Sequence, residues 1–198
     1  MEADLIRLEL AAIAARLIAD GGLDYASAKR KAARQAFGSG SPPRDAMPDN
    51  ELIDQALREH LALFDPAHGE RVALRRRMAC EWLERLAQFT PLVTGAVWKG
   101  LVTEHAPIHL QLFHDSHKEI EIDLLNRGIA FEIAMIGHFR RNDVEVEAIG
   151  FFWEETPILL SLYEPVDLRG ALRPGADGAE RGDRAALLAR MASEEADS

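Results

Sequence analysis

The sequence predicts an α+β fold, with an N-terminal helical region followed by a mixed β-sheet and flanking helices. Up to about residue 89, apolar residues recur at intervals of three and four, which is the helical period. After Pro91 they occur in short alternating runs, which is the pattern of strands. We therefore expect a helical region over residues 1–90, an α+β domain over 91–174 and a mostly disordered tail over 175–198.

Four helices are expected in the first region. Glycines, capping aspartates and prolines divide the chain there into residues 6–20, 25–37, 50–64 and 67–89. Between the second and third helices, the turn-rich segment Gly38–Pro48 is predicted to be a flexible linker. In the fourth helix, Arg75–Arg77 are expected to face solvent, and Cys80 to be a buried structural thiol.

The second region is expected to contain five strands and a capped helix. The predicted strands cover residues 92–97, 108–113, 129–136, 144–153 and 157–163. The helix, over residues 116–127, begins at a capping box formed by Ser116 and Glu119. The last two strands are predicted to form a hairpin, and residues 167–172 to form one helical turn.

The chain is acidic, with a formal net charge of -10 and a pI near 5.2. Such a chain has no global attraction to nucleic acid or to an anionic membrane. The single cysteine excludes an internal disulfide framework. The first residues have no basic segment typical of a signal peptide, and no apolar run approaches the ~20 residues that span a bilayer. We expect a soluble, cytoplasmic protein.

The run from Gly95 to Gly100, followed by the strand at residues 108–113, is the best candidate for a ligand site. A glycine after a strand lets an anion approach the backbone N–H groups, and Lys99 would add a positive charge. His109 and Gln111 share one face of the strand, because residues two apart do so. Gly95, Lys99, Gly100, His109 and Gln111 are therefore the predicted ligand-binding residues. The alternative is a tight turn beside an ordinary solvated sheet face.

Over about Leu92–Ile136, this pattern resembles the minimal nucleotidyltransferase superfamily. The resemblance implies a mixed sheet, two aspartates that hold Mg²⁺ and a third acid from a later strand. Here Pro107 and His109 occupy the aspartate positions, and only Glu132 matches the third acid. The resemblance therefore implies a catalytically degenerate protein that keeps a cleft for a nucleotide, another anion or a partner. No metal site is assigned, and Mg²⁺ is expected only if the site is active.

A second class of function would use the basic second helix. Lys29, Arg30, Lys31 and Arg34 lie close together on it, and the glycine turn before it allows a helix-turn-helix arrangement. In this alternative, the helical region is an interaction or regulatory module that binds nucleic acid or a protein. A charge run of this kind is also typical of a solvated helix face.

Overall fold

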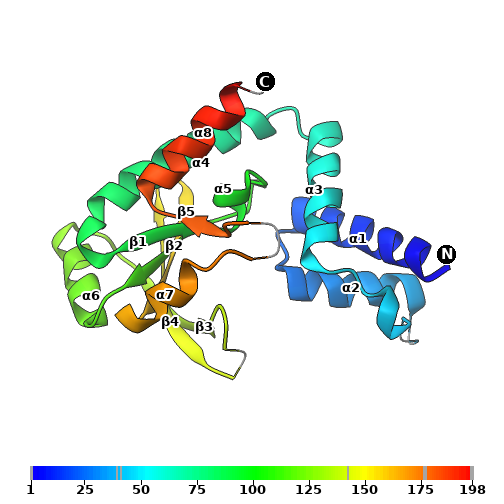
Figure 1. The fold of residues 1–198 in the computed structure, drawn as a ribbon, viewed down its shortest axis with the longest axis horizontal. Helices are drawn as coiled ribbons and strands as arrows, with labels where there is room; N and C mark the ends of the chain where they lie inside the picture. The colour runs from blue at the N-terminus through cyan, green and yellow to red at the C-terminus, as the bar shows by residue number, and fades with distance from the viewer. Residues whose placement is uncertain (1, 39, 41, 142, 176–177, 197–198) are drawn as a thin grey trace. The chain divides into compact units, whose positions relative to one another are not determined.

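The computed structural model describes residues 2–38, 40, 42–141, 143–175 and 178–196. It confirms the α+β fold, with N-terminal helices and a six-stranded mixed sheet (Figure 1). The chain forms two compact units, Met1–Val72 with Leu101–Ala106 and Ala73–Gly100 with Pro107–Ser198. The sequence analysis places the boundary at residues 90–91. The division between the two units instead follows Val72, which lies within the helix His68–Arg85. We call the first part the helical unit and the second the sheet unit.

The helical unit contains α1 (Glu2–Gly21), α2 (Tyr25–Phe37) and α3 (Asn50–Phe64). Helices α2 and α3 begin at the predicted caps. The side chain of Asp24 accepts a hydrogen bond from the Ser27 N–H, and that of Asp49 accepts one from the Leu52 N–H.

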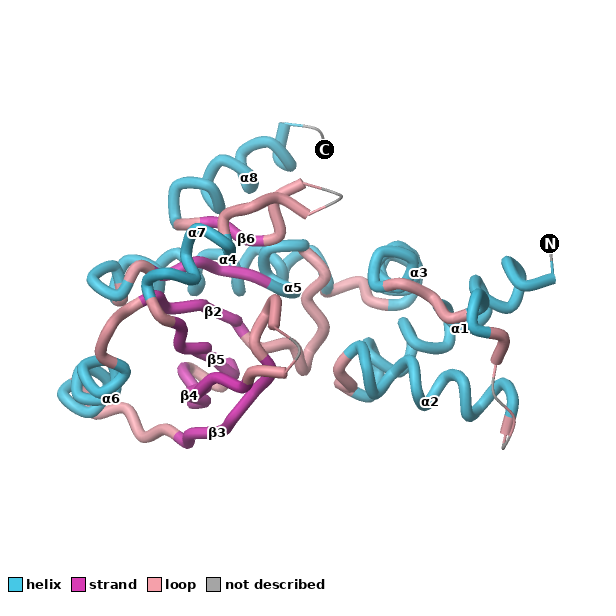
Figure 2. The backbone as a smooth tube through the Cα atoms, turned by 60° about the horizontal axis from the view of Figure 1, so that its bottom comes forward, coloured by secondary structure: helices cyan, strands magenta, loops and turns pink. Residues whose placement is uncertain are grey.

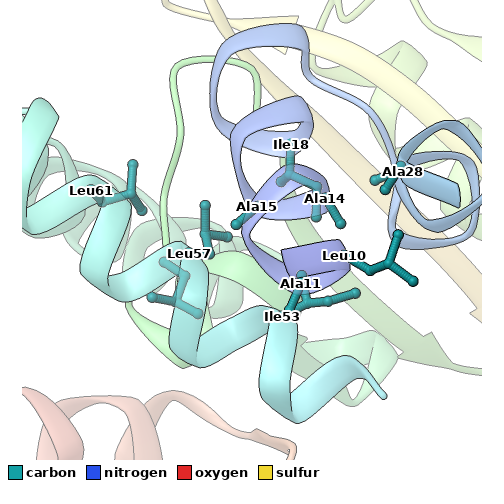
Figure 3. Close-up of a cluster of buried hydrophobic side chains, with 11 residues drawn as sticks. Leu10, Ala11, Ala14, Ala15, Ile18, Ala28, Ile53, Leu57 and Leu61 are labelled. Carbon is teal, nitrogen blue, oxygen red and sulfur yellow. The ribbon is translucent and has the colours of Figure 1, made fainter. Parts of the chain in front are cut away.

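Alanine lines the core of this unit. Small residues of α1 and α2 let the helices approach closely, while larger residues of α3 fill the remaining space (Figure 3). The fully buried members are Leu10, Ala11, Ala14, Ala15, Ala28, Ala32, Ile53, Leu57 and Leu61.

The predicted linker between α2 and α3 is partly ordered. It contains a 3₁₀ turn, Arg44–Ala46, in which Ala46 is buried. The side chain of Arg7 donates to the carbonyl of Asp45, which attaches this segment to α1. Residues 39 and 41 lie outside the described part of the chain.

The fourth helix, α4 (His68–Arg85), is followed by a 3₁₀ turn, Ala87–Phe89. The prediction that Arg75–Arg77 face solvent is wrong for Arg75 and Arg76, which are buried. Arg76 can be buried because its guanidinium donates to the carbonyls of Val97 and Trp98 and to Glu194. Cys80 is buried as expected, and burial raises the pKa of its thiol.

The sheet has the strand order β3-β4-β5-β2-β1-β6. Its strands are β1 (Pro91–Thr94), β2 (Ile108–Phe113), β3 (Glu132–Gly137), β4 (Glu145–Trp153), β5 (Thr156–Tyr163) and β6 (Arg181–Gly182). Among the strands of the described residues, only β2 and β5 pair in parallel, and the other pairs are antiparallel. The prediction that the first two strands are neighbours in one sheet is confirmed.

The first strand ends earlier than predicted. Gly95 has a φ of +67°, which takes the backbone out of the strand and into the short helix α5 (Gly95–Lys99). Gly100, with a φ of +71°, ends that helix. The segment predicted to be a glycine loop is therefore one helical turn between two glycines.

The capped helix, the hairpin and the helical turn are confirmed. Ser116 caps α6 (His117–Asn126) by accepting from the Glu119 N–H. At the hairpin turn, Glu154 and Glu155 have φ values of 47° and 64°, and a type I′ hairpin turn requires positive φ at both positions. The helical turn is α7 (Leu168–Ala171), after a 3₁₀ turn at Pro165–Asp167.

The segment predicted to be a mostly disordered tail contains β6 and α8 (Arg184–Ala196). Figure 1 shows α8 beside α4. Two ion pairs join these helices: Glu194 of α8 with Arg76, and Arg184 of α8 with Glu84. These contacts join residues about a hundred positions apart, so local composition gives no sign of them.

The sheet has two differently covered faces. On the first, which we call the helix face, Trp82 of α4 packs on Phe151 with ring centroids 5.0 Å apart. On the opposite face, which we call the loop face, Phe139 and α7 pack on Leu92, Phe113 and Tyr163. Figure 2 shows the strands stacked in order from β3 towards β6. Within the described residues, no helix is both long and apolar enough to cross a membrane.

Candidate functional site

A row of polar side chains crosses the loop face of the sheet. The antiparallel pairing of β1 with β2 places Thr94 beside His109, and the parallel pairing of β2 with β5 places Gln111 beside Ser161. Tyr163 follows two residues later on the same face. His109 and Gln111 thus lie on one face, as the alternation of the strand predicts.

His109 and Ser161 form a hydrogen bond of 2.8 Å between Nε2 and Oγ. Burial, with a smaller contribution from the positive charge of Arg181, lowers the pKa of His109 from 6.5 to about 4. The imidazole is therefore neutral at physiological pH. Ser161 is fully buried, so a substrate cannot reach its hydroxyl. The pair thus has a structural role and lacks the access that nucleophilic catalysis needs.

Gln111 and Tyr163 continue this buried row. Burial raises the pKa of Tyr163, and hydrogen bonds with Ser161 and Gln111 oppose the increase. Gln111 is only 2% exposed. Gln111 therefore lies in the interior, whereas His109 is half-buried.

Arg181 of β6 lies at the edge of this row, in register with Thr94. Its side chain is 9% exposed, and its guanidinium lies 4.7 Å from the centre of the Phe139 ring. Nη2 donates to Glu180 at 2.8 Å, whereas Nε has no hydrogen-bond partner within the described part of the chain. Burial, followed by the neighbouring Arg140 charge, lowers the pKa of Arg181 against the effects of Glu180 and Tyr163.

A pocket of about 310 Å³ opens at Arg181, and we call it the arginine pocket. Its described lining residues are Phe139, Arg140, Gly170, Arg173, Pro174, Gly175, Glu180 and Arg181. Three guanidinium groups and one carboxylate are among them, so the lining carries an excess of positive charge. An anion with several acceptor oxygens suits such a lining.

The loop after β3 holds Arg140 in place. Nδ1 of His138 accepts from the backbone N–H groups of Arg140 and Arg141, so the ring proton lies on Nε2. That nitrogen is 3.4 Å from the carboxylate of Asp167, which also contacts Arg141. Arg140 then donates from Nη1 to the carbonyl of Gly170 at 2.9 Å. The side chain is thus positioned before any ligand binds.

None of the predicted ligand-binding residues is among the described lining residues of this pocket. A Cβ atom on Gly95 would lie 3.9 Å from that of His109, so these two residues are neighbours. Gly100 instead approaches Arg76, because a Cβ there would lie 3.0 Å from Nη2. Lys99 ends α5 and does not line the pocket.

Helix α5 and the strand before it nevertheless support the pocket. The hydroxyl of Thr94 donates to the carbonyl of Glu180 at 3.1 Å. Trp98 Nε1 donates to the carbonyl of Ala179 at 2.7 Å. Together these bonds fix the backbone that carries Glu180 and Arg181.

Glu132 lies apart from His109. The strand register aligns Glu132, Gly150, Leu159 and His109 in one row, so two strands separate β3 from β2. With strands about 4.8 Å apart, this places the two residues roughly 14 Å from each other. Glu132 and Pro107 instead line a wider groove of about 810 Å³, in which apolar side chains predominate.

The residues of the alternative site lie on α2 in the helical unit. Arg30, Lys31 and Arg34 are exposed, whereas Lys29 is half-buried. Ala28 and Ala32 form the buried side of the same helix. This is the arrangement of an amphipathic surface helix with a positively charged outer face.

Within the described residues, no group of three or more His, Cys, Asp or Glu side chains is placed to hold a metal ion. The histidines near β2 are engaged separately, since His114 contacts Glu119 and His117 contacts Glu147.

Sequence reasoning did not find the arginine pocket. Arg173 and Arg181 lie beside or within the segment predicted to be disordered. Basic residues clustered after an apolar strand, as at Arg140 and Arg141, were the available signal. Comparison of this chain with protein-family models, with curated proteins and with solved structures finds no match.

Proposed function

We propose that the sheet unit binds a small anion, such as the phosphate group of a nucleotide, in the arginine pocket. The observation that carries the proposal is the convergence of Arg140, Arg173 and Arg181 on one pocket of about 310 Å³. This volume is near the lower end of the range for small-molecule sites. It suits a phosphate-sized group or the anionic end of a larger ligand.

The three arginines would contribute differently to such binding. Arg181 is largely withdrawn from water, so a hydrogen bond from it to an anion would be strong. Arg140 is already held against Gly170, which reduces the entropy lost on binding. Arg173 is exposed at the rim and is free to close on the ligand from solvent.

We further propose that the sheet unit does not catalyse metal-dependent nucleotidyl transfer. Pro107 offers no ligand atom, and the His109 ring is engaged in a hydrogen bond with Ser161. Glu132 is then the one carboxylate left among the three positions that the resemblance assigns to metal ligands. A two-metal mechanism needs carboxylates that converge on the metal ions. The proposed activity is therefore binding, with no chemical step assigned.

Calorimetric titration with inorganic pyrophosphate tests the binding proposal. We expect Arg173→Ala to weaken binding by roughly tenfold, because one charge-assisted hydrogen bond is lost. Arg169→Ala is the matched control, since Arg169 is exposed on α7 and does not line the pocket. Equal affinities of wild type and Arg173→Ala, or no binding by wild type, would contradict the proposal.

The same titration separates the proposal from the alternative site. The double variant Lys29→Ala, Arg34→Ala should bind pyrophosphate as wild type does, because α2 belongs to the helical unit. Lys99→Ala should have at most a small effect, since Lys99 lies outside the pocket lining. Loss of binding in the α2 variant alone would favour the helical interaction module.

A further inference from the structure

Strand β3 forms an open edge of the sheet. It pairs with β4 on one side over six consecutive residue pairs and has no neighbour on the other side in the described structure. The opposite edge strand, β6, is only two residues long. An unpaired edge leaves backbone N–H and C=O groups available to another strand.

The composition of β3 does not protect this edge. Its sequence, EIAMIG, has one charge and neither lysine nor proline, and its register with β4 contains no bulge. Ile133 and Met135 are 48% and 54% exposed. Large apolar side chains at this exposure on an open edge are typical of a surface that a partner covers.

We propose that a second copy of this chain covers the edge, through antiparallel pairing of β3 with β3 around a two-fold axis at Ala134. Such an axis, perpendicular to the sheet, keeps each face continuous and pairs residues of the same parity. Ile133 of each copy then lies opposite Met135 of the other copy, so the dimer contains two such pairs. This register joins the four exposed side chains into one apolar cluster on the helix face.

The charges in this register are compatible with self-association. Glu132 lies opposite Ile136, so the two glutamates are separated by about 13 Å along the strands. Glu147, which neighbours Met135 on β4, is engaged by His117 of α6 at 3.0 Å. Ala134, at the axis, is small enough for the two strands to approach closely. No like charges are thus placed directly opposite each other.

The net charge of -10 on each copy opposes association, and salt screens it. Since six residues of strand form a small interface, the dimer is expected to exchange with monomer. Its population should increase with protein concentration and with salt.

Light scattering after size exclusion tests the dimer with the full chain. The wild type, at 22.0 kDa per chain, should approach twice that mass as concentration increases. The variant Ile133→Lys, Met135→Lys should remain at the monomer mass, because lysines would then face lysines across the axis. A wild type that stays monomeric at every concentration, or a dimer that persists in this variant, would overturn the proposal.

A cysteine at the axis tests the register. Opposite Cα atoms in antiparallel strands are about 4.5–5.5 Å apart, within the range that a disulfide bridges. Ala134→Cys should therefore give a covalent dimer on mild oxidation. Leu172→Cys, with an exposed thiol directly after α7, should not, and the buried Cys80 should not react in either. Equal cross-linking of the two variants would overturn this register.

Discussion

At the scale of single residues, burial determines what the polar groups of the loop face do. His109 is neutral because the surrounding side chains remove water from it and Arg181 adds a nearby positive charge. Arg181 remains charged but is largely desolvated. A neutral imidazole beside a desolvated guanidinium avoids repulsion between two buried cations. The charge available to an anion is thus concentrated on the arginines.

The pKa of His109 has a measurable consequence for stability. Because the folded-state pKa is about 4, the unfolded chain takes up a proton between pH 6.5 and 4 that the folded chain does not. The free energy of unfolding should therefore decrease as pH falls through this window, by up to about 3 kcal/mol. Urea titrations of wild type and His109→Gln should diverge there. Parallel profiles, or a ring that titrates near pH 6.5 by NMR, would contradict the assignment.

Gly170 offers a second test at this scale. A Cβ atom there would lie 3.1 Å from Nη1 of Arg140, so Gly170→Ala should displace that guanidinium from its carbonyl partner. Pyrophosphate affinity should decrease several-fold while the melting temperature stays the same or increases, since alanine favours the helix. Gly150→Ala is the control, because its Cβ would enter open space. Unchanged affinity in Gly170→Ala would show that Arg140 does not contribute.

At the scale of elements, α8 holds β6, and with it Arg181, against the sheet. Arg76 of α4 pairs with Glu194 of α8, and Arg190 of the same helix lies 4.9 Å from the Trp98 ring centre. Gly182 of β6 packs so closely on Trp98 that a Cβ there would lie 2.6 Å from the indole. Docking of α8 and the position of the arginine pocket are therefore linked.

Glu194→Gln should weaken this docking. The substitution removes the charge that neutralises the buried Arg76, and it should cost roughly 1–3 kcal/mol. Hydrogen exchange should accelerate in α8, residues 184–196, and remain unchanged in α6, which serves as an internal control. Exchange that accelerates equally in both helices would indicate a general loss of stability instead of local release.

The elements also show what the sequence could predict. Capped helices such as α6 and the hairpin of β4 and β5 were predictable, because their signals are local: a capping serine, an alternating run and a two-residue turn. The end of β1 at Thr94 was not, since an apolar run does not show that Gly95 adopts a positive φ. The docking of α8 and the burial of Arg76 were not predictable either, because both depend on the contact between Arg76 and Glu194, which are 118 positions apart in the sequence.

The candidate site was only partly predictable for the same reason. The sequence placed His109 and Gln111 on one strand face, and the strand register confirms that placement. It could not show that Phe139 and α7 cover this face, nor that Arg173 and Arg181 approach Arg140. Those arginines come from three separate segments, so only the folded chain brings them together.

At the scale of the whole molecule, the chain separates a helical unit from a sheet unit. The arginine pocket and the edge strand β3 both lie in the sheet unit, whereas the basic face of α2 lies in the helical unit. The proposed binding and the proposed self-association are therefore properties of one unit. They can be tested independently, because β3 does not line the arginine pocket.

The most direct test of anion binding is an NMR titration of the ¹⁵N-labelled full chain with inorganic pyrophosphate. The account predicts saturable shifts in three segments, 139–141, 168–175 and 178–182, which surround Arg140, Arg173 and Arg181. The amide resonances of α2, and those of residues 128–132 in the wider groove, should not shift. Shifts confined to α2, or no saturable shifts in the three segments, would contradict the account.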